Sequence, residues 1–131
     1  MINSVVENWH GIISGANPEA LNELLADDVV FYSPVVFTPQ RGKAITAMYL
    51  LAAFATLAGP DSDFHYVKEV LDGNTAALEF ESTIDGKYVN GVDIITCDDA
   101  GKIIEFKVMI RPLQAINAIH EKMRAALEAA S

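Results

Sequence analysis

Apolar residues recur at steps of three and four in four stretches of the chain, and this spacing predicts four helices. The four stretches are residues 2–15, 17–28, 43–57 and the segment that follows Pro112. In the second stretch, Asn17 is expected to cap the N-terminus of the helix, with Pro18 in the first helical position. Gly59 and Pro60 are expected to end the third helix.

Elsewhere the apolar period changes to two, which predicts β-strands. One strand should end near Ser33, because a residue that precedes proline avoids the helical region. Four more strands are expected near residues 63–71, 75–84, 88–97 and 102–111. The segments DGN, DGK and DDAG separate them, and Asp-Gly is typical of tight hairpin turns. Helices followed by an antiparallel meander indicate an α+β fold, in which a curved, mostly antiparallel sheet wraps around the N-terminal helices as a half-open barrel, with one helix at the C-terminus.

Composition narrows the class of protein. The chain has 131 residues, 51% of them hydrophobic, so we expect one domain over residues 1–131 with a core that needs no disulfide. Its single cysteine, Cys97, excludes an internal disulfide. The net charge of −9 argues against binding to nucleic acid or to an anionic membrane. The N-terminal segment MINSVVENWH has no secretory pattern, and we expect a cytoplasmic protein.

Asp93 is an ionisable residue in the strand-like segment GVDIITC, which is otherwise largely apolar. If DDAG forms the following turn, Asp93 lies opposite Phe106 and Ile95 lies opposite Ile104. Alternation then predicts one inward face, made of Asp93, Ile95, Cys97, Ile104, Phe106, Val108 and Ile110. Burial on that face would raise the pKa of Asp93, and such a carboxyl can donate a hydrogen bond or act as a base. The alternative is that Asp93, beside Gly91, is solvated or caps a turn.

The remaining candidates would line a cavity around Asp93. Trp9 belongs either to this cavity or to the core, and His65 either points inward as a proton donor or acceptor or faces solvent. The complete set of candidate pocket residues is Trp9, Tyr32, Tyr49, His65, Phe80, Ile95, Phe106 and Val108. The three histidines form no i, i+4 pair and no phosphate-binding loop is present, so neither a metal nor another cofactor is expected.

The order of elements, together with the segments LLADDVVFYSP and DDAGKIIEFKVMIRP, resembles the nuclear transport factor 2-like superfamily. Within it, the chain is most similar to the SnoaL-like polyketide cyclase and ketosteroid isomerase branches. The resemblance covers almost the whole chain and implies one cone-shaped domain with a cavity. The superfamily includes isomerases, cyclases, epoxide hydrolases, dehydratases and non-enzymes, so the fold does not imply one reaction. Its members commonly pair through the outer face of the sheet, which implies a homodimer.

The isomerases of this superfamily use three residues that can be matched locally. They are a Tyr on the first helix, an Asp before the proline of the first strand, and a neutral Asp at the start of the penultimate strand. These positions fall on Trp9, Ser33 and Asp93, so only Asp93 keeps its residue type. Steroid isomerase chemistry by that mechanism is therefore disfavoured. Epoxide hydrolase activity is also disfavoured, because it needs an Asp–Arg–Asp arrangement and the strand AALEFESTID contains no Arg.

Two functions remain open. The leading hypothesis is a small pocket protein, resembling an isomerase, cyclase or lyase, that acts on an apolar small molecule by cofactor-free acid–base chemistry at Asp93. The alternative is a non-catalytic module for ligand binding or dimerisation, because two of the three isomerase positions differ. A nuclear transport role is a weaker third hypothesis, since nothing in the sequence indicates a nuclear partner.

Overall fold

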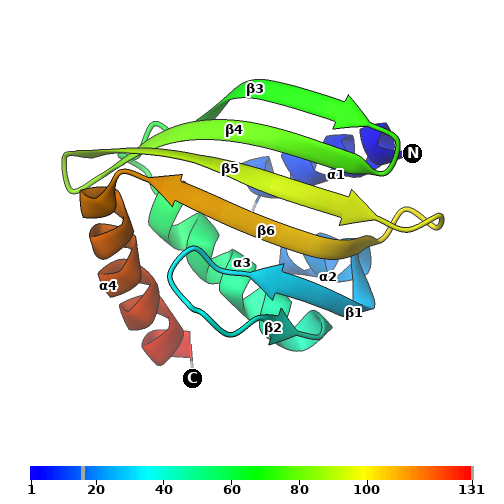
Figure 1. The fold of residues 1–131 in the computed structure, drawn as a ribbon. Helices are drawn as coiled ribbons and strands as arrows, with labels where there is room; N and C mark the ends of the chain where they lie inside the picture. The colour runs from blue at the N-terminus through cyan, green and yellow to red at the C-terminus, as the bar shows by residue number, and fades with distance from the viewer. Residues whose placement is uncertain (16, 131) are drawn as a thin grey trace.

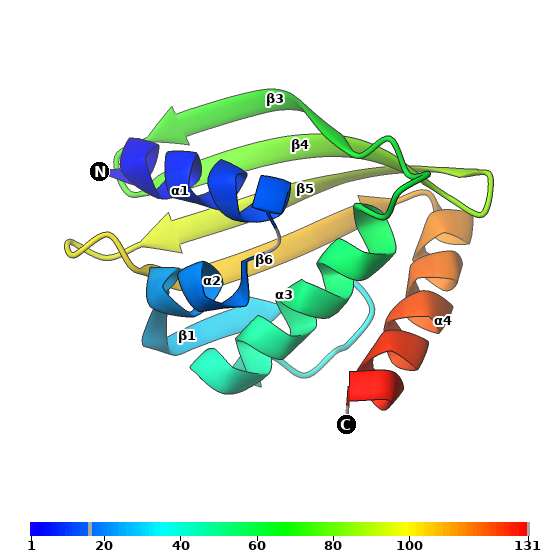
Figure 2. The same cartoon turned by 180° about the vertical axis from the view of Figure 1, so that it is seen from behind.

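The computed structural model describes residues 1–15 and 17–130. In this part of the chain, four helices lie on one side of a six-stranded sheet (Figures 1 and 2). The helices are α1 (Ile2–Gly15), α2 (Pro18–Leu24), α3 (Lys43–Leu57) and α4 (Leu113–Ala130). The strands are β1 (Leu25–Tyr32), β2 (Gln40–Arg41), β3 (His65–Asp72), β4 (Thr75–Ile84), β5 (Lys87–Cys97) and β6 (Ile103–Arg111).

The sheet has the strand order β2-β1-β6-β5-β4-β3. Strands β1 and β6 run parallel, and every other neighbouring pair is antiparallel. The sheet curves over α1, α2 and α3 without closing, so that β2 and β3 form its two edges (Figure 1). The expected α+β fold with a curved, mostly antiparallel sheet and a C-terminal helix is confirmed. No helix in the described ranges combines the length and apolarity that a membrane crossing requires.

The second helix begins as predicted and ends earlier than predicted. The side chain of Asn17 accepts hydrogen bonds from the backbone N–H groups of Glu19 and Ala20, which caps the helix. The helix stops at Leu24, because Leu25 adopts an extended conformation and starts β1. The prediction of a helix up to Asp28 is therefore wrong. The short strand β2 pairs antiparallel with β1.

The predicted register of the last hairpin is wrong by two residues. Asp93 pairs with Val108, not with Phe106, and Ile95 pairs with Phe106, not with Ile104. A β-bulge brings Cys97 opposite Ile103, which leaves Ile104 as an extra residue instead of a member of the inward face. A shift by two residues does not change the face on which a side chain lies. Asp93 therefore still faces the inside of the curved sheet.

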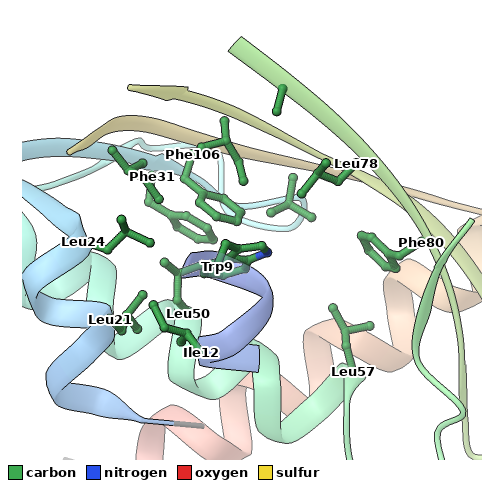
Figure 3. Close-up of a cluster of buried hydrophobic side chains, with 14 of the residues drawn as sticks. Trp9, Ile12, Leu21, Leu24, Phe31, Leu50, Leu57, Leu78, Phe80 and Phe106 are labelled. Atoms are coloured by element: carbon green, nitrogen blue, oxygen red, sulfur yellow. The ribbon is translucent and has the colours of Figure 1, made fainter. Parts of the chain in front are cut away.

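Trp9 lies at the centre of the core between the helices and the sheet. It is 2% exposed, and its ring contacts Phe106 of β6 and Phe54 of α3 at centroid distances of 4.9 and 5.3 Å. Figure 3 shows Trp9 between Phe106 on the sheet side and Leu50 on the helix side. These contacts fix the indole ring, because close-packed aromatic side chains have few alternative rotamers available.

Candidate functional site

A cavity lies between the concave face of the sheet and helices α1, α3 and α4. Its walls are apolar except at one corner, where Trp9, Tyr66 and Asp93 meet. The other lining residues are Ile13, Phe31, Pro34, Leu50, Ala53, Phe54, Leu57, Ala58, Phe64, Phe80, Phe106, Val108, Ile110, Ile119 and Met123. The volume of the cavity is about 40 Å³. Only a very small molecule fits without rearrangement, so a larger ligand requires side chains to move.

Asp93 is the carboxyl group of this corner. It is 6% exposed and lies between Leu78 of β4 and Val108 of β6, which offer it no hydrogen-bond donor from their side chains. The hydroxyl of Tyr66 donates to Asp93 Oδ2 at 2.6 Å, and no described residue donates to Oδ1. Burial raises the pKa of Asp93 from 3.8 to about 7, and the hydrogen bond from Tyr66 limits this rise. Both protonation states are therefore accessible near neutral pH.

Tyr66 reaches this corner because β3 contains a bulge. Tyr66 pairs with Phe80 whereas Lys68 pairs with Glu79, so Val67 is an extra residue in the strand. The ring of Tyr66 makes edge contacts with Phe64 at 5.2 Å and with Phe80 at 6.3 Å. Burial raises the pKa of Tyr66 well above its ordinary value, and the charge of Asp93 adds to this effect. Tyr66 is therefore a neutral phenol at physiological pH.

Trp9 supplies the third polar group of the corner. Its indole Nε1–H donates to the hydroxyl oxygen of Tyr66 at 2.9 Å. An indole nitrogen carries one hydrogen and accepts none, so the direction of this hydrogen bond is fixed. The three side chains thus form a chain of hydrogen bonds from Trp9 through Tyr66 to Asp93, which joins α1, β3 and β5.

Gly91 precedes Asp93 by two residues and lies on the same inward face of β5. A Cβ atom at this position would lie 2.5 Å from Cζ of Phe80 and 2.7 Å from the carbonyl oxygen of Met109. The Phe80 ring therefore lies directly against the backbone of β5, and the absence of a side chain at Gly91 makes this possible. Gly91 in this way contributes to the shape of the cavity wall.

Four predicted pocket residues line the cavity together with Asp93. They are Trp9, Phe80, Phe106 and Val108. Ile95 is fully buried on the same face of the sheet, but it packs in the core beyond the cavity wall. The alternative of a solvated Asp93 is wrong, because both neighbouring strands and Tyr66 cover its side chain.

The other three predicted pocket residues lie elsewhere. Tyr32 is on the outer face of the sheet, where Lys107 Nζ lies 4.9 Å from the centre of its ring. Tyr49 packs against Phe31 at 5.8 Å in the core and is absent from the cavity wall. His65 is on the outer face, with Nε2 at 3.3 Å from an oxygen of Glu81. The placements of Tyr32, Tyr49 and His65 in the cavity are therefore wrong.

Tyr66 was missed, although its strand carried a signal. Phe64 and Tyr66 alternate with His65 and Val67, so one of the two pairs must face inward. Both pairs contain one apolar and one polar-capable residue, and the alternation alone does not select between them. The structure selects Phe64 and Tyr66, which both line the cavity.

Ser33 takes no part in this corner. Its hydroxyl accepts a hydrogen bond from the backbone N–H of Val35 at 3.2 Å, while the adjacent Pro34 lines the cavity. The position that matches the pre-proline Asp of the isomerases thus stabilises a local turn. Within residues 1–15 and 17–130, no three His, Cys, Asp or Glu side chains are grouped so that they could hold a metal ion.

Residues 6–106 match the family model of the SnoaL-like domain. The chain belongs to this family. The expected membership of the nuclear transport factor 2-like superfamily, and of its SnoaL-like branch, is thereby confirmed. Among proteins with curated descriptions, none matches the chain.

Several solved structures are similar to this chain. A steroid delta-isomerase from Pseudomonas aeruginosa is 32% identical, with a TM-score of 0.88 over 98% of this chain and 94% of the other. A bacterial protein with a cystatin-like fold from Silicibacter pomeroyi is 26% identical, with a TM-score of 0.84 over 92% and 83%. The epoxide hydrolase/cyclase-like enzyme SalBIII is 17% identical, with a TM-score of 0.66 over 83% and 89%, and this similarity concerns the fold alone.

Proposed function

We propose that this SnoaL-like protein binds an apolar small molecule in the cavity and acts on it through Asp93, without a cofactor, as an isomerase- or cyclase-like enzyme. One observation carries the proposal: a single buried carboxyl group, with Oδ1 free of any donor from the described residues, lines an otherwise apolar cavity. Such a group is matched to proton transfer near neutral pH, because its pKa is about 7.

The simplest reaction for one such group is a proton shift next to a carbonyl. Ionised Asp93 takes a proton from the carbon beside the carbonyl of the ligand, and the electron pair of the broken C–H bond moves toward the carbonyl oxygen as an enolate. The protonated carboxyl then returns the same proton to the distal carbon of a conjugated system, which restores the carbonyl and ionises Asp93 again. No oxidant or second substrate is needed. The similarity to a steroid delta-isomerase supports this reaction class.

The proposal differs from the isomerase mechanism with two acids. One carboxyl group cannot be a base and a neutral hydrogen-bond donor at the same time, and Ser33 offers no second acid. We therefore expect a modest rate on a small unsaturated ketone instead of efficient turnover of a steroid. The size of the cavity also favours a small ketone over a steroid, because its volume of about 40 Å³ is far below that of typical ligand pockets.

The test uses cyclohex-3-enone, whose conversion to the conjugated isomer is followed by ultraviolet absorbance. We expect the wild-type protein to accelerate the conversion, Asp93→Asn to lose at least about tenfold in rate, and Asp93→Glu to keep part of it. Glu81→Gln is the matched control, because Glu81 is a carboxylate on the outer face of the sheet. An Asp93→Asn variant with the wild-type rate would show that Asp93 is not the reacting group.

A non-catalytic binding module is the second candidate. The observation that favours it is that the cavity holds a single carboxyl group, while Trp9 and Ser33 occupy the other two matched isomerase positions. The same experiment separates the two functions. If wild-type protein binds toluene or phenol but leaves cyclohex-3-enone at the rate of buffer alone, and Asp93→Asn binds equally well, the module is the better description.

We also propose that two copies pair through the outer face of the sheet, as the family resemblance implies. The centre of this face carries Val70 and Met109, whose side chains are 57% and 49% exposed, with Val92 between them. Glu79 and Asn90 adjoin this apolar centre. Their hydrogen bond to each other lowers the free energy needed to remove the two polar groups from water. A second copy of the same face would remove these apolar side chains from water.

A further inference from the structure

We infer that the cavity recognises the hydrogen-bonding group of its ligand through Asp93 Oδ1, because Trp9 and Tyr66 are positioning residues whose donors are already committed within the protein. This inference rests on the proposed function only in taking Asp93 as the group that meets the ligand. It concerns binding, so it holds or fails independently of any turnover.

The direction of the hydrogen-bond chain is the first step. Trp9 Nε1 can only donate, so the oxygen of Tyr66, 2.9 Å away, must accept. The single hydroxyl proton of Tyr66 is then directed to Asp93 Oδ2 at 2.6 Å. Tyr66 has one proton, and donating it to Asp93 leaves none for a ligand. A ligand can at most offer a proton to the remaining lone pair of Tyr66.

The rigidity of the chain is the second step. Trp9 is held between Phe54 and Phe106, and the ring of Tyr66 is held by edge contacts with Phe64 and Phe80. On its far side, the Tyr66 ring meets His10 of α1 at 5.4 Å. The ring contacts keep the hydroxyl oxygen of Tyr66 in place, and turning its proton toward a ligand would break the hydrogen bond to Asp93 Oδ2. The carboxyl of Asp93 is thus held with Oδ2 toward Tyr66 and Oδ1 without a partner among the described residues.

The surroundings of Asp93 contain no other group that could serve a ligand. The neighbours across the strands are Leu78 and Val108, and all remaining lining side chains are apolar. The ionisable groups that face Tyr66 from α1 and β3 are His10, whose ring contacts the Tyr66 ring, and Glu69, which pairs with His10 at 2.6 Å. They are separated from Asp93 by the Tyr66 side chain and are partly exposed.

The ligand preference should therefore change with the protonation of Asp93. When Asp93 is ionised, the corner offers acceptors only and selects a ligand with a hydroxyl or N–H group. When Asp93 is protonated, Oδ1 can carry the only available proton and accommodates a carbonyl group. With a pKa of about 7, this change falls near neutral pH. Above this pKa the cavity favours apolar alcohols and phenols, and below it the affinity for small ketones increases.

The experiment compares the binding of phenol, cyclohexanone and toluene at a pH well below and a pH well above the midpoint of the Asp93 titration. We expect the ratio of phenol to cyclohexanone affinity to rise by about tenfold from the low to the high pH, with toluene unchanged, because one hydrogen bond is exchanged. Asp93→Asn should lose this pH dependence. A pH-independent ratio in the wild-type protein, or the same pH dependence in Asp93→Asn, would overturn the inference.

Two further variants test the positioning roles. Tyr66→Phe should shift the titration of Asp93, followed by carboxyl carbon NMR, to higher pH, whereas a residue that only donates to the ligand would leave it in place. Trp9→Phe keeps an aromatic ring but removes the N–H that directs the Tyr66 proton toward Asp93, so the Tyr66 hydroxyl can also donate to cyclohexanone. We expect Trp9→Phe to bind cyclohexanone more tightly at low pH than the wild-type protein. Unchanged Asp93 titration in Tyr66→Phe contradicts the positioning role.

Discussion

The hydroxyl of Tyr66 donates to the carboxyl of Asp93 across 2.6 Å, although their strands β3 and β5 are separated by β4. The sheet is curved (Figure 1). Both residues project from its concave face, so their side chains meet across β4. The hydrogen bond thus spans three strands and depends on the shape of the sheet. Any change that flattens this region should separate the two groups and alter the titration of Asp93.

Stability should decrease as the pH rises from about 4 to about 7, the range between the pKa of Asp93 in the unfolded and in the folded chain. The folded pKa is raised, so the folded protein binds a proton that the unfolded chain releases, and this contribution is lost as the pH rises through about 7. The contribution is at most about 4 kcal/mol, from the size of the shift. Urea unfolding at several pH values measures it. Asp93→Asn should remove this part of the decrease of the unfolding free energy with pH. An equal decrease in both proteins would show that the pKa of Asp93 is not raised in the folded protein.

Tyr66→Phe should destabilise the protein by about 1–2 kcal/mol and raise the pKa of Asp93 above about 7. The reason is that Tyr66 is the only described donor to the carboxylate, and Asp93 Oδ2 would lose it in a buried site. Unfolding in urea and carboxyl NMR measure the two effects. Tyr88→Phe is the control, since Tyr88 donates to Glu81 on the exposed outer face. If both variants leave the Asp93 titration unchanged, the hydrogen bond from Tyr66 is not formed in solution.

Gly91→Ala should destabilise the fold by about 1–3 kcal/mol, because the new Cβ would overlap the ring of Phe80 and the backbone oxygen of Met109. Phe80→Leu in the same chain should restore part of the loss, since a smaller side chain removes one of the two overlaps. A double-mutant cycle in urea measures this coupling. Gly11→Ala in α1 has open space around the new methyl group and should be neutral or stabilising. Additive effects of Gly91→Ala and Phe80→Leu would mean that the ring does not lie against Gly91.

Met109→Asp should convert a dimer into a monomer, if the outer face of the sheet joins two copies. A carboxylate in the middle of this apolar patch has a higher free energy when a second copy buries it than when water surrounds it. Sedimentation or light scattering at several protein concentrations gives the mass. Met48→Asp places the same change on the exposed side of α3 and should leave the mass as in the wild type. A monomeric wild-type protein, or a dimer that survives Met109→Asp, would exclude this face.

The element order was predictable because it rests on local periodicity. The alternation that placed Asp93 inward survived an error in register, since a shift by two residues preserves the face. The register itself depends on the turn, where the backbone N–H groups of Ala100 and Lys102 both donate to the side chain of Asp98. This turn is followed by the bulge at Ile104. Neither feature follows from counting residues between two strands.

The composition of the site was less predictable, for a physical reason. Tyr66 lies on an edge strand, and its inward direction depends on its pairing with Phe80 and on the bulge at Val67. These are contacts between segments distant in sequence. The prediction for His65 was wrong for the same reason, since His65 lies on the same strand and faces outward. Trp9 and Phe106 were easier to place, since each belongs to an apolar stripe or face that must be buried.

The bulge at Val67 has a consequence for the open sheet as a whole. A sheet that does not close leaves two edges whose free backbone groups can pair with strands of other molecules. Here one edge is β2, which is only two residues long, and the other is β3, whose ladder is interrupted at Val67. Neither edge offers a long regular template. The irregular strand that orients Tyr66 therefore also protects the protein against aggregation by strand addition.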